Sequence, residues 1–315
     1  MTDDPRAEKR PSRERLVLAA LLIAVFGAML FAKALASGGL EQTAMFYVGI
    51  PALIAVTVVL TARPRSAVGL TLAVTTIGLA LAGPLLDEGV VCLIMAAPLI
   101  YGVAALIAWL VSLLVTPGQR HHQALVAAPL LAAALIEGVA GVSYLPRESA
   151  ASATVMVDAS PEAYAAALAA PPAYGPFDAV LLKTVPFPHP VSATGSGLEV
   201  GDRRLVRFND RKSLGLGAEA TPRSMTLRVA ESDIDTDAGR VVFEVTADST
   251  LSRWMELQSA TVVWHRVGDR TETTWTLDWA RTYDPSWYFG PLQQHTTGLA
   301  AGYLADTFAA AAAGS

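Results

Sequence analysis

Five apolar stretches dominate the first 145 residues of this 315-residue chain and limit the folds that it can adopt. They run over 16–36, 44–62, 67–86, 90–115 and 124–144. Each is close to the length of about 20 residues with which an α-helix crosses the hydrocarbon core of a bilayer. Polar side chains are too sparse within them for an amphipathic surface helix or an ordinary globular core. We therefore expect a transmembrane domain of five helices over 16–145, preceded by a short basic tail over 1–15.

Basic residues flank these stretches on one side of the expected membrane. The tail carries five of them, and the connections after the second and fourth stretches carry Arg63, Arg65, Arg120, His121 and His122. The other two connections carry the acidic residues Glu41, Asp87 and Glu88. Because Lys and Arg accumulate in cytoplasmic loops, we expect a multi-pass protein of the cell membrane with a cytoplasmic N-terminus. Five crossings then place the C-terminal domain outside the cytoplasm.

One carboxylate, Glu137, lies within the fifth stretch. A charged side chain at the centre of a membrane helix costs roughly 2.5–3.5 kcal/mol on insertion scales and usually faces a bundle interior or a cavity. Two interpretations stay open: a proton or ligand contact, and a hydrogen-bonded packing residue. Gly138 and Gly141 would allow a neighbouring helix to approach closely at this point.

The remaining residues show the alternation and turn signals of a β-rich soluble domain. A strand is expected over 153–158, and Ser160 with Pro161 forms an N-cap and a first helical residue, so a helix should follow to about residue 170. The passage over 171–190 is rich in proline and unsuited to a central strand. Further strands are expected over 198–209, 224–232, 240–247, 260–267 and 271–283, and a terminal helix to 313.

This order of elements resembles the START-like (SRPBCC) superfamily of polyketide cyclase/dehydrase and lipid-transfer domains. The residues that carry the resemblance are TVMVDASPE at 154–162, GLEVGDR at 197–203 and the final hairpin that leads into the terminal helix. The run WYFGP at 287–291, in a chain with a membrane half, is similar to a bacterial group of membrane-bound members. The resemblance implies an α+β protein whose helix-grip domain over 150–313, a curved antiparallel sheet around a long C-terminal helix, contains a cavity.

Aromatic side chains are concentrated where that cavity is expected. Five of the six tryptophans lie in the last quarter of the chain, and alternation places Trp275 and Trp279 on one face of a strand. Two interpretations stay open: these side chains pack between sheet and helix, or they line an apolar ligand pocket. The candidate pocket residues are Trp264, Trp275, Trp279, Trp287 and Tyr288.

Two groups of polar residues are candidate chemical sites. His265 and Asp278 lie on adjacent expected strands, and a histidine oriented by a carboxylate can act as an acid or base near neutral pH. Both could equally be polar residues of a solvent face. Arg203, Arg204 and Arg207 could meet an anionic headgroup, although alternating arginines are also typical of a solvated edge.

The sequence predicts no metal site and specifies no cofactor. Asp233, Asp235, Asp237 and Glu244 have the spacing of a calcium loop, but Ala238 stands where that loop needs glycine, so a solvated hairpin turn is expected. The single cysteine, Cys92, cannot form an internal disulfide. A net charge of −5 without a basic face argues against nucleic-acid binding.

The most economical expectation is a membrane-anchored START-like domain that binds a hydrophobic or amphipathic small molecule, such as a lipid. Its partners would then be the lipid bilayer and that ligand, and no pattern specifies an oligomeric state. Two alternatives stay open. One is an enzyme of the polyketide cyclase/dehydrase kind that uses His265 and Asp278. The other is a structural or regulatory membrane module without catalysis.

Overall fold

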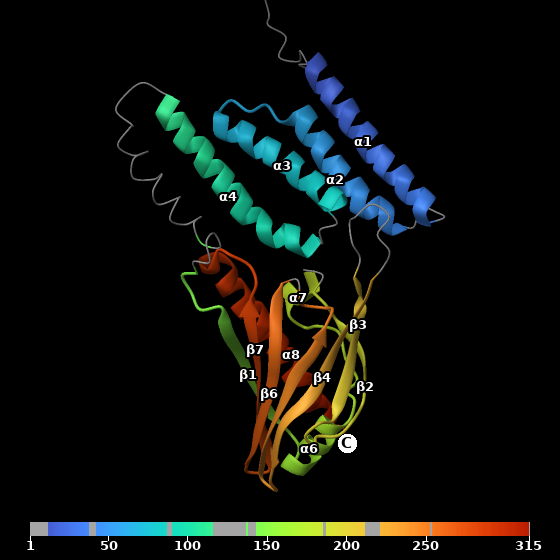
Figure 1. Cartoon of the computed structure of the whole chain (residues 1–315), viewed down its shortest axis with the longest axis vertical. Coiled ribbons are helices and arrows are strands. Elements are labelled where there is room, and N and C mark those ends of the chain that lie inside the picture. The colour runs from blue at the N-terminus through green and yellow to red at the C-terminus, as the bar shows by residue number, and fades with distance from the viewer. Residues whose placement is uncertain are drawn as a thin grey trace, which may run out of the picture. The chain divides into compact units, whose positions relative to one another are not determined.

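The structure is a computed structural model that describes residues 12–37, 42–86, 90–115, 137, 143–184, 187–211, 221–252 and 254–314 (Figure 1). Its elements divide between two compact units, one containing α1 to α4 and the other the remaining elements. In chain order they are α1 (Arg13–Ser37), α2 (Gln42–Thr61), α3 (Ala67–Leu86), α4 (Val90–Val115), β1 (Glu148–Val157), α6 (Pro161–Ala169), α7 (Val180–Thr184), β2 (Pro190–Thr194), β3 (Arg203–Arg211), β4 (Thr221–Ile234), β5 (Ala238–Asp248), β6 (Met255–Val267), β7 (Arg270–Arg281) and α8 (Ser286–Ala313).

The helical unit packs its consecutive helices against one another, α1 on α2, α2 on α3 and α3 on α4. Leu22 and Phe26 of α1 are buried against Ala55 and Val59 of α2 in its apolar core. Large apolar side chains also face outward, and several are more than half exposed. They include Val17, Leu21, Ile23, Phe31, Leu53 and Val74.

The expectation of five membrane-crossing helices needs correction. Within the residues that the structure describes, one helical segment, Leu93–Ser112 of α4, is long and apolar enough to span a bilayer. The apolar helical segments Ile50–Thr61 and Ala67–Ala82 are shorter than the roughly 20 residues that a crossing requires. Most of the fifth stretch lies outside the described residues. A five-helix transmembrane bundle is therefore not shown.

The second unit contains a seven-stranded antiparallel sheet in the order β1-β7-β6-β5-β4-β3-β2. The sheet is curled, and the long helix α8 packs against β1 and β7 (Figure 1). α6 packs against the same helix. This α+β arrangement, a curled antiparallel sheet with a long C-terminal helix, fits the expected helix-grip fold. The main core lies between these layers and includes Tyr164, Trp264 and Phe308.

Local sequence signals account for several of the element boundaries. The Ser160 hydroxyl accepts a hydrogen bond from the Ala163 amide at 3.3 Å, and Pro161 begins α6. Gly268 turns the β6–β7 hairpin with a φ of 63°, a conformation that glycine adopts without strain. In β7, every second residue from Thr271 to Arg281 is buried, as the alternation predicts. α7 and β2 were not predicted, since both lie at the proline-rich passage.

Candidate ligand-binding site

An apolar cavity of about 120 Å³ lies between the sheet and α8 in the second unit. Its wall combines alternate residues of β3 to β7 with residues of α8 and of the proline-rich passage. The sheet contributes Arg204, Val206, Phe208, Met225, Leu227, Phe243, Met255, Leu257, Ala260, Trp275 and Leu277, and α8 contributes Thr297, Ala300, Tyr303, Leu304 and Phe308. The cavity is thus a small and almost wholly apolar space.

The proline-rich passage forms the remaining side of this cavity, through Tyr174, Phe177 and Phe187 among others. Phe177 makes edge-on contacts with Phe187, His189 and Tyr303, with ring centroids 6.1, 4.8 and 4.7 Å apart. The Gly175 carbonyl oxygen is 2.7 Å from both the Tyr303 hydroxyl and His189 Nε2. The contacts of Phe177 and Gly175 with Tyr303 hold this passage against α8. We call the described residues of this passage, 173–184 and 187–190, the cover segment.

One charged side chain, Arg204 of β3, lies in the wall and is 5% exposed. Its Nη2 atom donates to the carbonyl oxygens of Leu168 at 2.7 Å and Ala169 at 3.3 Å, at the end of α6. Nε is buried and has no hydrogen-bond partner within the described residues. The guanidinium carbon lies 5.4 Å from the centre of the Phe243 ring. Burial lowers the pKa of Arg204 because it penalises the charged form.

Tyr174 of the cover segment also lines the cavity and interacts electrostatically with Arg204. Burial raises the pKa of Tyr174 to about 12, and the positive charge of Arg204 acts in the opposite direction. The phenol therefore stays neutral at physiological pH. Arg204 is thus the one charged side chain of the cavity wall, and Tyr174, Thr297 and Tyr303 are its hydroxyl-bearing side chains.

The candidate pocket tryptophans occupy different positions. Trp275 lines the cavity and stacks on Phe308 with a centroid distance of 5.0 Å. Trp264 and Trp279 are each 1% exposed and belong to the packed core rather than to the cavity wall. Trp264 covers Gly239, where any side chain would collide with the indole ring.

The other two aromatic candidates lie at the start of α8. Trp287 is 45% exposed, and its ring contacts Tyr288 at a centroid distance of 6.0 Å. Tyr288 also contacts Phe289 edge-on at 5.0 Å. Neither Trp287 nor Tyr288 borders the cavity.

The strand register separates the candidate acid–base residues. His265 pairs with Glu272, and its Nε2 atom lies 3.5 Å from Glu272 Oε1. Asp278 pairs with Ser259 and accepts a hydrogen bond from its hydroxyl at 2.8 Å. Neither His265 nor Asp278 borders the cavity. The structure does not bring the two side chains together.

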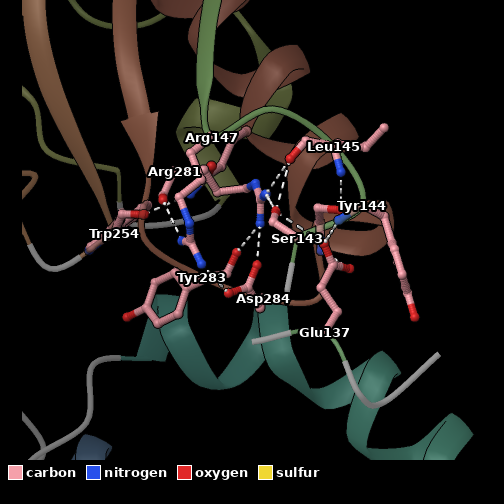
Figure 2. A network of polar contacts seen from close by, with 11 residues as sticks. Glu137, Ser143, Tyr144, Leu145, Arg147, Trp254, Arg281, Tyr283 and Asp284 are labelled. Atoms are coloured by element: carbon pink, nitrogen blue, oxygen red, sulfur yellow. Dashed lines mark hydrogen bonds and ion pairs between the residues drawn. The ribbon is translucent and has the colours of Figure 1, made fainter. Parts of the chain in front are cut away.

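Glu137 takes part in a polar network of the second unit, shown in Figure 2. The carboxylate accepts hydrogen bonds from the backbone amides of Tyr144 and Ser286, each at 2.7 Å. The second amide belongs to the first residue of α8. Since the first amides of a helix have no partner within it, Glu137 stabilises the start of α8. It is 5% exposed.

The centre of the same network is Arg281, at the end of β7 (Figure 2). Nη1 donates to the Tyr283 carbonyl and to Asp284 Oδ1, both at 2.6 Å. Nη2 donates to the Ser143 hydroxyl at 2.8 Å and to the Leu145 carbonyl at 3.2 Å. Arg147 adds a second ion pair to Asp284 at 2.8 Å. The network joins residues 143–147 to the junction between β7 and α8.

The sequence does not distinguish Arg204 from its neighbouring arginines and does not indicate that the cover segment lines a site. The sequence treats Arg203, Arg204 and Arg207 alike, as residues of a solvated edge or as contacts of an anionic headgroup, but Arg203 and Arg207 are exposed and Arg204 is buried. A signal was present, because Arg204 shares its strand face with the apolar Val206 and Phe208. A charged residue on an otherwise apolar face is a candidate for a buried role.

Comparison with known proteins finds similarity in fold alone. No protein-family profile matches the sequence, and no curated protein matches it. Similar solved structures include ginseng major latex-like protein 151 from Panax ginseng, with 14% identity, a TM-score of 0.27 and coverage of 50% of this chain and 99% of that one. Truncated norcoclaurine synthase from Thalictrum flavum has 11% identity, a TM-score of 0.31 and coverage of 54% and 96%. The Aha1 dimer from Colwellia psychrerythraea has 15% identity, a TM-score of 0.26 and coverage of 51% and 96%.

Proposed function

We propose that this chain is a membrane-anchored START-like protein that binds a hydrophobic or amphipathic small molecule between its sheet and α8. The observation that carries the proposal is the apolar cavity of about 120 Å³. An apolar cavity of about 150 Å³ is known to stay dry and to bind benzene. A cavity of this volume therefore suits a small ring or a short chain. Most small-molecule pockets measure roughly 300–1,000 Å³, so a lipid would require the cover segment to move.

Transfer of the ligand from water drives binding in this proposal. Each buried methylene group contributes about 0.8 kcal/mol before the entropy of immobilisation is subtracted. The cavity wall offers few polar groups, so neutral apolar parts of a ligand lose little hydrogen bonding when they enter. The separated positions of His265 and Asp278 offer no acid–base pair facing this space. We therefore favour binding over catalysis.

Membrane attachment is the second part of the proposal. The segment Leu93–Ser112 has the length and composition of a span. Val17, Phe31 and Leu53 are each at least two-thirds exposed, an arrangement that costs little in lipid and much in water. The basic tail over 1–15 favours a cytoplasmic N-terminus. A crossing by Leu93–Ser112 would then place the C-terminal domain outside the cytoplasm.

Native mass spectrometry of the full chain in detergent tests the ligand-binding part. We expect a small molecule to be retained by the unaltered protein and lost from Ala300→Leu, which fills the cavity wall. Ala310→Leu is the matched control, because Ala310 is an exposed residue of the same helix. Equal retention by Ala300→Leu and the control, with both folded, would contradict binding in this cavity, as would protein that is ligand-free and takes up no apolar compound.

Carbonate extraction tests the membrane part. Washing membranes at alkaline pH removes proteins held by surface contacts but leaves those with a helix through the bilayer. We expect the full chain to stay in the membrane pellet. A variant with Leu99→Lys and Ala104→Lys, which interrupts the apolar run of Leu93–Ser112, should be retained less well. Complete release of the unaltered protein would exclude a spanning anchor.

A further inference from the structure

Arg204 carries a buried charge that has no counter-charge among the described residues. It is 5% exposed and forms part of the cavity wall. None of the ion pairs found among the described residues involves it. A buried cation of this kind is unfavourable unless it is paired and fully hydrogen-bonded.

The contacts that Arg204 makes compensate this charge only in part. Its Nη2 atom meets two carbonyl oxygens at the end of α6. A helix C-terminus carries the equivalent of about half a negative charge at most. The ring of Phe243 adds a cation–π contact at 5.4 Å. The Nε–H group still has no acceptor in the described part of the chain. The Nε–H group and part of the positive charge are therefore left without a partner among the described residues.

We propose that Arg204 binds the carboxylate of the ligand, and that the cavity takes a small apolar carboxylic acid in its ionised form. The inference rests on the proposed ligand-binding function and specifies its ligand class. A guanidinium group suits this role because its planar N–H donors match the two oxygens of a carboxylate. The apolar remainder of the wall, including Trp275 and Phe308, receives the ring or chain of the acid.

A purely structural role is the competing explanation, in which Arg204 only caps α6. Such a role predicts no preference for a charged ligand over a neutral one of equal shape. An anchor predicts a strong preference that disappears with the guanidinium. Benzoate and nitrobenzene separate the two explanations, since they have the same planar shape and differ in charge. Both are a benzene ring with one planar substituent of three non-hydrogen atoms, so the comparison keeps the volume of the ligand constant.

Isothermal titration calorimetry of the full chain in detergent, corrected with empty micelles, measures both affinities. We expect benzoate to bind at least about ten-fold more tightly than nitrobenzene, the factor that one charge-assisted hydrogen bond supplies. Arg204→Met should abolish this preference. Arg207→Met is the matched control because Arg207 is an exposed arginine of the same strand, and it should leave the preference unchanged.

The outcomes separate this inference from the function on which it rests. Equal binding of benzoate and nitrobenzene by the unaltered protein overturns the acid anchor and leaves apolar binding standing. Failure of both compounds to bind overturns the proposed function and the inference with it. A preference for benzoate that survives in folded Arg204→Met assigns the acid to another residue and also overturns the inference. If Arg204→Met does not fold, the comparison of the two compounds on the unaltered protein decides.

Discussion

Two arginines are buried in the same sheet, and their surroundings are opposite. Arg281 is 3% exposed and donates to Asp284, Ser143 and two carbonyl oxygens. Arg204 is 5% exposed and has two carbonyl acceptors, no carboxylate and a free Nε–H among the described residues. Burial alone therefore does not distinguish a structural charge from a binding one. The two kinds of charge differ in whether every N–H group has an acceptor. A fully paired arginine has no free donor for a ligand.

The largest expected effect comes from removing the paired arginine. Arg281→Met leaves Asp284 with only Arg147 as a cation and leaves the Ser143 hydroxyl without its donor. Breaking a buried ion pair on one side costs about 3–5 kcal/mol. We expect the free energy of unfolding to fall by about 3 kcal/mol in urea titrations followed by tryptophan fluorescence.

Arg270→Met is the control for that measurement, since Arg270 is an exposed arginine of the same strand. Its effect should stay within about 0.5 kcal/mol. A loss of stability in Arg281→Met no larger than in this control would remove the distinction between the two buried arginines.

An intermediate effect is expected from Tyr164, a buried neutral group whose hydroxyl accepts hydrogen bonds from Thr273 at 2.8 Å and Trp275 Nε1 at 3.0 Å. Burial raises the pKa of Tyr164 to about 12, with these hydrogen bonds acting in the opposite direction. In the unfolded chain a tyrosine ionises near pH 10. Its contribution to stability is therefore complete below about pH 10 and lost as the pH rises through about 12, by about 2.7 kcal/mol in total.

Urea titrations between about pH 9 and pH 12 measure this alkaline loss. Tyr164→Phe should make the free energy of unfolding fall less steeply with pH. Tyr174→Phe provides a matched comparison, because the pKa of Tyr174 is also raised to about 12. An unchanged slope in Tyr164→Phe would show that this hydroxyl ionises in the folded protein as it does in water.

The smallest effect is expected from the unpaired arginine. Arg204→Met removes two hydrogen bonds to the end of α6 but also removes a charge that the fold compensates only in part. These contributions oppose each other, and methionine fills much of the same space. We expect the free energy of unfolding in the absence of ligand to change by less than about 1 kcal/mol. A loss as large as that of Arg281→Met would make Arg204 a structural residue of the same kind.

Much of the fold followed from local patterns. The alternation over 271–283 predicted β7, and Ser160 with Pro161 predicted the start of α6. β2 was missed because it begins at Pro190, yet it is an edge strand of the sheet, where a proline at the first position is tolerated. The apolar stretches predicted helices over 16–115, but their ability to cross a membrane depends on the length of uninterrupted apolar helix, which only Leu93–Ser112 reaches within the described residues.

The candidate site followed less completely. Trp264, Trp275 and Trp279 are all buried. Strand alternation predicts that Trp275 and Trp279 lie on the same face of β7. Only the packing of α8 decides that Trp275 borders the cavity while the other two fill the core. His265 and Asp278 lie on neighbouring strands, but their register, set by the β6–β7 turn, gives each a different partner.

The sequence by itself determined the division of this chain into an apolar helical part and a strand-rich part, since both depend on periodicity and composition along the chain. Tertiary structure alone decided which charges are paired. Arg204 meets carbonyl oxygens 35 and 36 positions earlier, and Arg281 meets Ser143 across 138 positions. Contacts over such separations depend on how the sheet curls and where the helices dock. Local preferences do not encode these contacts, because the helix or strand propensity of a residue does not specify partners so far away in the chain.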